Sequence, residues 1–80
     1  MPTIGRIGPD RFLFFSNERG EPPHVHIERE ESVAKFWLDP VRLASSSGFS
    51  ARELRRLEPL VLEHRIRFVE AWHEFFGPQQ

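Results

Sequence analysis

Two histidines and a glutamate recur at every second position within residues 21–28, EPPHVHIE. The two prolines keep the backbone extended, and the alternation of apolar and polar residues after them is typical of a β-strand. Such a strand places His24, His26 and Glu28 on one face. Imidazole and carboxylate groups side by side can bind a divalent metal, and histidine exchanges protons near neutral pH. An edge strand with a solvated polar face explains the same pattern, and the sequence leaves both interpretations open.

The histidine pair could cut RNA without a metal. In that chemistry one histidine removes the proton of a 2′-hydroxyl, a second group protonates the leaving oxygen, and a cation stabilises the phosphorane. The candidate catalytic residues are His24, His26, Lys35 and Arg65. Lys35 joins the face of the histidines if its strand pairs with theirs in one antiparallel register, whereas a slip of one residue puts it on the other face.

Metal binding through His24 and His26 is an alternative to this chemistry. It would need further ligands from elsewhere, and the sequence shows no second ligand pair. The chain has no cysteine, which excludes disulfides and thiolate ligands, and we predict no cofactor. His73-Glu74 resembles half of a zinc-protease motif, but Gly77 stands where the second histidine would be, so we reject that interpretation.

Four arginines in the C-terminal half could meet anionic groups. Arg65 falls among apolar residues on a helical plot, so it needs a carboxylate or a phosphate as its partner. Asp39 and Glu28 are the candidate carboxylates, and a structural ion pair is the alternative to a functional role. Three further arginines are candidate substrate-binding residues: Arg52, Arg55 and Arg56. They would contact phosphates or an acidic partner, or else form a solvated helix face.

Short strands must position the histidines and Lys35. Apolar or alternating runs predict strands at 1–8, 11–16, 25–29 and 33–38. Glycine, proline and asparagine predict a turn at 8–10 and a loop at 17–20. Asp39-Pro40 ends the last strand, and the serine-rich segment 41–48 is predicted to be a connection.

A helix is expected from Ser50 to about Phe76. Ser50 is the N-cap and Glu53 stands at N3, which is the pattern of a capping box. Apolar residues at helical spacing form one broad face, wide enough to cover a sheet, and Gly77 ends the helix. Pro59 interrupts the run, so it either kinks the helix or begins a second one.

These elements predict a single α+β domain, 1–80, with a small antiparallel sheet of three or four strands packed against one long C-terminal helix. Eight Phe and two Trp supply the core of so short a chain. No apolar run could span a membrane and no signal peptide opens the chain, so we expect a cytoplasmic protein. The net charge of −1 is not that of a strongly basic nucleic-acid binder. Weak net repulsion favours a protein partner or a homodimer.

Four motifs resemble a family of small bacterial proteins defined as domain of unknown function 4160. They are FFSNE at 14–18, EPPHVH at 21–26, AKFWLDPVRL at 34–43 and AWHEFF at 71–76. Members are often encoded beside another small protein, an arrangement that resembles a toxin–antitoxin pair, in which one member is commonly a ribonuclease or an inhibitor. The resemblance implies a small protein partner encoded nearby, and RNA as a substrate if the chain is the toxin. The resemblance assigns no catalytic residues. Within the matching motifs, His24 and His26 are the positions that a site would use.

Three functions follow from these observations. The first is the toxin-like component of a two-protein bacterial module, a metal-independent ribonuclease that acts through His24 and His26. The second is a non-catalytic interaction module that binds a small partner protein through its aromatic surface, with both histidines dispensable. The third is a metal-binding protein that uses the same two histidines. The sequence alone does not decide whether the protein is an enzyme.

Overall fold

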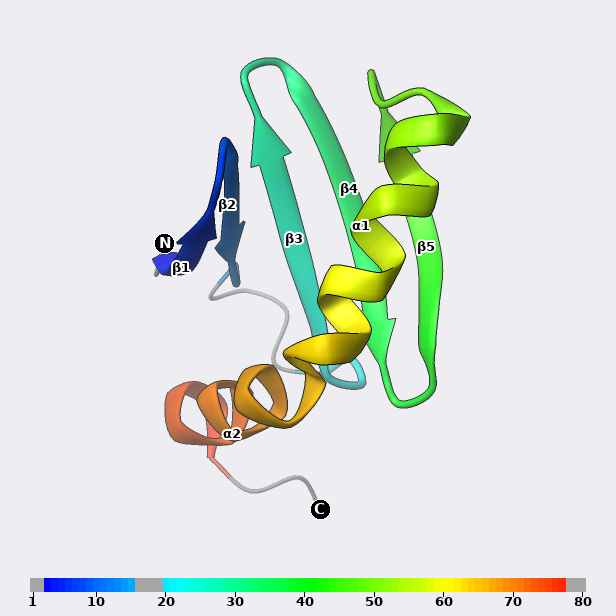
Figure 1. Cartoon of the computed structure of the whole chain (residues 1–80). Helices are drawn as coiled ribbons and strands as arrows, with labels where there is room; N and C mark the ends of the chain where they lie inside the picture. The colour runs from blue at the N-terminus through cyan, green and yellow to red at the C-terminus, as the bar shows by residue number, and fades with distance from the viewer. Residues whose placement is uncertain (1–2, 16–19, 78–80) are drawn as a thin grey trace.

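The strands of the sheet lie side by side in the order in which they occur along the chain (Figure 1). The computed structural model describes residues 3–15 and 20–77. Within these residues the strands are β1 (Thr3–Ile7), β2 (Asp10–Leu13), β3 (His24–Arg29), β4 (Ser32–Leu38) and β5 (Val41–Ser47). Every neighbouring pair is antiparallel. This antiparallel sheet, together with the two helices described below, confirms the predicted α+β class. The predicted loop at 17–20 lies almost entirely outside the described residues.

The sheet has five strands in the described part of the chain, so the prediction of three or four strands was wrong. The additional strand is β5, in the segment predicted to be a connection. It was missed because apolar residues alternate only from Val41 to Leu43, and the three serines that follow supply neither apolar alternation nor strong strand formers. An edge strand needs neither, since the backbone of β4 supplies its hydrogen bonds. Gly48 follows β5 at a φ of 94°, and a Cβ there would lie 2.7 Å from the Oγ of Ser32, so this corner requires glycine.

Two helices follow the sheet, α1 (Ala51–Glu63) and α2 (Arg65–Phe76), so the prediction of one long helix was wrong. Pro59 lies inside α1 and neither ends it nor begins another helix. The break falls at His64, with φ −103° and ψ 14°. The backbone N–H and the ring Nδ1 of His64 both donate to the carbonyl oxygen of Leu60, at 3.1 and 3.0 Å, which satisfies an acceptor at the end of α1.

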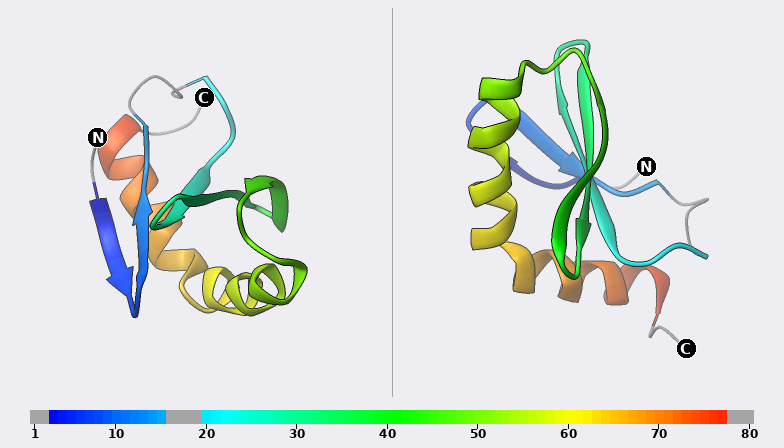
Figure 2. Two further views of the ribbon diagram at one scale, coloured as in Figure 1. Left: turned by 90° about the horizontal axis from the view of Figure 1, so that it is seen from above. Right: turned by 90° about the vertical axis from the view of Figure 1, so that its right-hand side faces the viewer.

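The break redirects the chain across the end of the sheet. Figure 2 shows α1 running along one face of the strands and α2 turning away beneath them. This turn brings aromatic residues of α2 under β2: Phe68 stacks on Phe12 at 5.2 Å between ring centroids, and Trp72 packs edge-on against Phe14 at 5.2 Å. A straight helix would carry these rings past the sheet, so burial of aromatic area favours the break.

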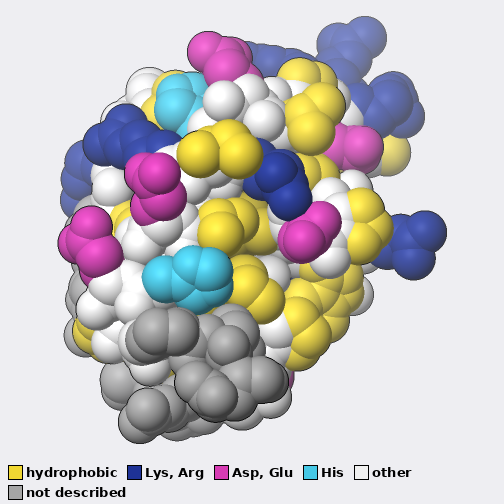
Figure 3. All heavy atoms as spheres, turned by 90° about the horizontal axis from the view of Figure 1, so that it is seen from below, with side chains coloured by type: hydrophobic (Ala, Val, Ile, Leu, Met, Phe, Trp, Pro, Cys, Tyr) yellow, Lys and Arg dark blue, Asp and Glu magenta, His cyan; other side chains and the backbone are white. Residues whose placement is uncertain are grey.

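The core lies between the two helices and one face of the sheet. Its residues include Phe12, Ile27, Phe36, Leu57 and Trp72, all of them buried. On the surface at the α2 end, apolar side chains are interspersed with charged side chains of both signs (Figure 3). None of the helices in the described residues is long and apolar enough to cross a membrane.

The strand register determines which side chains share the opposite face. His26 pairs with Leu13 on one side and with Lys35 on the other, and His24 pairs with Trp37. Lys35 therefore lies on the face of the histidines, which is one of the two registers that the sequence left open. The alternate residues of β3, such as Val25, point to the core. The polar face of β3 is turned away from α1.

Candidate functional site

The ring of His24 is completely buried, with 0 % of the residue exposed. Its centroid lies 4.7 Å from that of Trp72 in α2 and 5.5 Å from that of Trp37 in β4. Nδ1 donates a hydrogen bond of 2.8 Å to the carbonyl oxygen of Pro22. His24 therefore joins α2 to the start of β3. A substrate cannot reach this ring while the chain is folded.

His26 and Lys35 face each other across β3 and β4, and both are partly exposed. The His26 ring lies edge-on to His24, at 5.1 Å between centroids, and 4.4 Å from the ring of Phe15. The Nζ of Lys35 donates to Glu21 at 2.6 Å and lies 4.6 Å from the centroid of the Trp37 ring. The structure thus brings His24, His26 and Lys35 together, but only the second and third of these reach the surface.

Glu28 continues the polar face of β3, but its carboxylate is held by an arginine. Nη2 of Arg11 donates to Oε1 of Glu28 at 2.7 Å. Among the described residues, no group of three or more histidine, aspartate or glutamate side chains could hold a metal ion. The metal-binding hypothesis at His24 and His26 therefore gains no support from the arrangement of possible ligands.

Arg65 lies at the beginning of α2. Its Nε donates to the carbonyl oxygen of Leu38 at 2.6 Å, and its Nη2 lies 3.0 Å from Oδ1 of Asp39. Asp39 is one of the two carboxylates that the sequence offered. The contact joins α2 to the end of β4.

The three arginines of α1 lie on the helix that covers the core face, so the sheet separates them from His26. Arg52, Arg55 and Arg56 are exposed. Arg55 lines a groove of about 250 Å³ between α1 and the β5 side of the sheet. The groove residues are Phe36, Leu43, Ala51, Leu54, Arg55 and Glu58. The candidate substrate-binding arginines are therefore not part of the histidine site.

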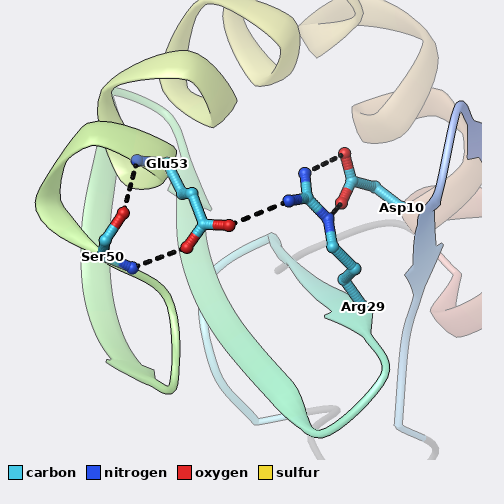
Figure 4. Close-up of polar contacts among 4 residues, drawn as sticks. All are labelled: Asp10, Arg29, Ser50 and Glu53. Atoms are coloured by element: carbon cyan, nitrogen blue, oxygen red, sulfur yellow. Dashed lines mark hydrogen bonds and ion pairs between the residues drawn. The ribbon is translucent and has the colours of Figure 1, made fainter.

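A charged cluster that the sequence analysis did not identify joins β2, β3 and the start of α1 (Figure 4). Arg29 donates from Nε and Nη2 to the two carboxylate oxygens of Asp10, at 2.8 and 3.2 Å, and from Nη1 to Glu53 at 3.0 Å. Asp10 is only 3 % exposed. The guanidinium carbon of Arg29 also lies 5.5 Å from the centroid of the Phe49 ring. The sequence did contain a signal for this cluster. In the alternation of β3, the charged Arg29 falls on the core face with Val25 and Ile27.

Glu53 connects this cluster to the cap of α1. Ser50 Oγ accepts from the N–H of Glu53 at 3.1 Å, and Oε1 of Glu53 accepts from the N–H of Ser50 at 2.8 Å, which confirms the predicted capping box. This backbone hydrogen bond holds the pKa of Glu53 below its usual value, and the positive charge of Arg29 acts in the same direction. The hydrogen bonds that Arg29 donates to Asp10 raise the pKa of Arg29.

The lowered pKa of Glu53 predicts a loss of stability in acid. A carboxylate whose pKa is lower in the folded state than in the unfolded state stabilises the fold above its unfolded pKa. That stabilisation is lost as the pH falls from about 4.3 through the folded pKa. We expect the urea midpoint of Glu53→Gln to lie below that of the wild type at pH 7, with the two midpoints converging as the pH falls below about 4.3. If the difference between the two urea midpoints stayed constant as the pH falls, the lowered pKa of Glu53 in the folded state would be contradicted.

A family model described as Domain of unknown function (DUF4160) matches residues 11–73 and confirms the resemblance seen in the sequence. No curated protein and no solved structure matches the chain.

Proposed function

Because the chain belongs to the family Domain of unknown function (DUF4160), we propose that it is a non-catalytic interaction module. Its partner is a small protein encoded beside it, within a two-protein module of the toxin–antitoxin type. The observation that carries the proposal is that β5, the edge strand of the described sheet, lies next to an apolar groove. Here β5 presents an exposed strand, and Leu43 is 39 % exposed above the groove that α1 forms with the sheet.

The contacts of the histidine face also favour binding over chemistry. His24 is enclosed by Trp37 and Trp72, so the two imidazoles cannot act as an acid–base pair on one substrate. Lys35 is hydrogen-bonded to Glu21. Each of these side chains has a structural role that needs no substrate.

A ribonuclease is the second candidate function, and one observation favours it. His26 and Lys35 are direct neighbours across β3 and β4, and both are partly exposed. An imidazole beside an ammonium group could deprotonate a 2′-hydroxyl and stabilise the charge that develops on the phosphate. Such an enzyme would need an acid other than His24, because that ring is buried.

Co-expression of the tagged chain with the small protein encoded next to it tests the proposal. We expect a stable complex on size-exclusion chromatography, and we expect His26→Ala to retain it with a Kd within about twofold of the wild type. His26→Ala is preferred to a substitution of His24, because loss of the buried ring would destabilise the fold.

The wild type and His26→Ala also separate the two candidate functions. Each is induced alone in a bacterial host, after circular dichroism has shown that both are folded, and cellular RNA is examined. If the wild type arrests growth and cleaves RNA while folded His26→Ala does neither, the ribonuclease is correct. If no complex with the neighbouring protein forms, the interaction module is wrong.

A further inference from the structure

Three exposed arginines lie close together in the first two turns of α1, and we call them the arginine stripe. Arg52, Arg55 and Arg56 stand at positions i, i+3 and i+4 of the segment ARELRR, 51–56. At about 100° per residue these positions fall on one side of the helix, opposite the buried Leu57 and Val61. The stripe therefore faces away from the core. Lys and Arg side chains gather at the upper right of Figure 3, on the side where α1 lies.

The arginine stripe has no partner within the described residues. None of its guanidinium groups forms a hydrogen bond or an ion pair there. The carboxylates of the same helix are directed elsewhere, because Glu53 is held by Arg29 and the cap of α1. Glu58 lines the groove beside β5 without forming an ion pair with Arg55. Arg56 contributes to the lowered pKa of Glu53, but only as the last of its causes.

The positions of the three arginines are electrostatically unfavourable for α1 itself. Arg52 stands in the first turn, where the helix dipole already places positive charge. Arg55 and Arg56 follow it at three and four positions, a spacing at which like charges destabilise a helix. A cluster that opposes its own helix and has no partner in the fold is the kind of local conflict expected at a functional surface. A bound anion would relieve each of these repulsions.

The phosphates of a nucleic acid fit the arginine stripe better than an acidic protein segment does. A guanidinium group binds a phosphate through two parallel hydrogen bonds. From position 52 to position 56 the helix rises about 6 Å, a length over which one DNA strand presents about two phosphates. Protein partners are usually anchored by buried apolar or aromatic side chains. None of the exposed large apolar side chains in the described residues lies within 51–56, and contacts to a phosphate backbone need no such anchor.

We infer that the arginine stripe of α1 binds the phosphate backbone of a nucleic acid. The inference goes beyond the proposed function, because it concerns the chain alone and requires no protein partner. The sheet separates the stripe from His26, so the stripe is also distinct from the candidate ribonuclease site. The net charge of −1 does not oppose such binding, since charges more than about 10 Å away are largely screened at about 0.1 M salt.

Fluorescence anisotropy of the purified chain with a labelled oligouridylate and a labelled DNA duplex tests the inference. For the single strand we expect log Kd to rise with log[salt] with a slope of about 2, because three neutralised phosphates release their counterions. The stripe variant Arg52→Gln/Arg55→Gln/Arg56→Gln should raise the Kd at low salt by at least about tenfold and bring the slope close to zero. Binding of one probe alone identifies the nucleic acid as RNA or DNA.

Three other arginines provide a control with the same change in net charge. Arg6, Arg42 and Arg67 are exposed and form no ion pair within the described residues. The variant Arg6→Gln/Arg42→Gln/Arg67→Gln should change the Kd by less than about threefold, because these charges lie outside the stripe. If this control weakened binding as much as the stripe variant, the overall charge would be responsible and the inference would be wrong.

Thermal unfolding separates binding from a structural role of the arginines. Removal of like-charge repulsion should leave the melting temperature of the stripe variant equal to or above that of the wild type. A lower melting temperature would show that the arginines stabilise the fold and would contradict the inference. It is also wrong if neither nucleic acid binds at low salt, or if polyglutamate binds as tightly as the oligouridylate. The proposed function stands in each of these cases, because its test is the complex with the neighbouring protein.

Discussion

Arg29→Met is expected to lower the free energy of unfolding by about 3 kcal/mol, because it leaves the carboxylate of Asp10 buried without its partner. Asp10 is 3 % exposed, and both of its oxygens accept from Arg29. The same substitution removes the contact between Arg29 and Glu53 at the start of α1. Urea unfolding at pH 7, followed by far-UV circular dichroism, measures the effect.

A second arginine provides the control for this prediction. Arg11 also joins β2 to β3 through a carboxylate, that of Glu28, but the two side chains are 27 % and 29 % exposed. Arg11→Met should therefore cost only about 0–1 kcal/mol. Equal losses in the two variants would show that burial of Asp10 is not the cause. Adding Asp10→Asn to Arg29→Met should recover part of the loss, because the unpaired charge is then gone.

Trp72→Ala is expected to cost about 3–5 kcal/mol, as is usual when a large buried aromatic side chain is removed. The Trp72 ring contacts Phe14, Phe76 and His24, at 5.2, 4.2 and 4.7 Å between centroids. The total stability of a native protein is about 5–15 kcal/mol, so this loss is a large share of it and the melting temperature should fall markedly. Thermal unfolding followed by circular dichroism measures it.

Two further variants identify which property of Trp72 matters. The indole Nε1 is buried and has no hydrogen-bond partner among the described residues. Trp72→Phe keeps a buried ring and removes this unsatisfied donor, so it should cost well under half as much as Trp72→Ala. Ile66→Ala changes a side chain of α2 that is 63 % exposed, and it should cost less than about 0.5 kcal/mol. If Ile66→Ala lowered the free energy of unfolding as much as Trp72→Ala, the loss would come from a general disturbance of α2 rather than from the core contact of Trp72.

The histidine face could be predicted because a strand has a strict period of two. Val25 and Ile27 had to point to the core, which put His26 and Glu28 on the other face. The place of Lys35 beside His26 depended on the strand register, which the sequence left open and the structure decides. The start of α1 was equally predictable, since a capping box depends only on residues that are three positions apart.

The burial of His24 could not be predicted from the same alternation. The period of a strand assigns a side chain to a face, but it does not indicate which later segment covers the end of that face. Here α2 crosses the end of the sheet, and Trp72 closes over His24. That path depends on the break at His64, whose position in the helical pattern carries no glycine or proline to mark it.

The order of the elements along the chain has a consequence for biosynthesis. All of the strands precede both helices, so a ribosome completes the sheet-forming segment before it makes any of the residues that cover it. At about 5–20 residues per second, translation of the helical segment takes roughly 1–5 seconds. During that interval Phe12, Ile27 and Phe36 have no helix to pack against. Until α2 has been made and Trp72 can close the core, these apolar side chains are uncovered, which is the condition that favours aggregation of incomplete chains.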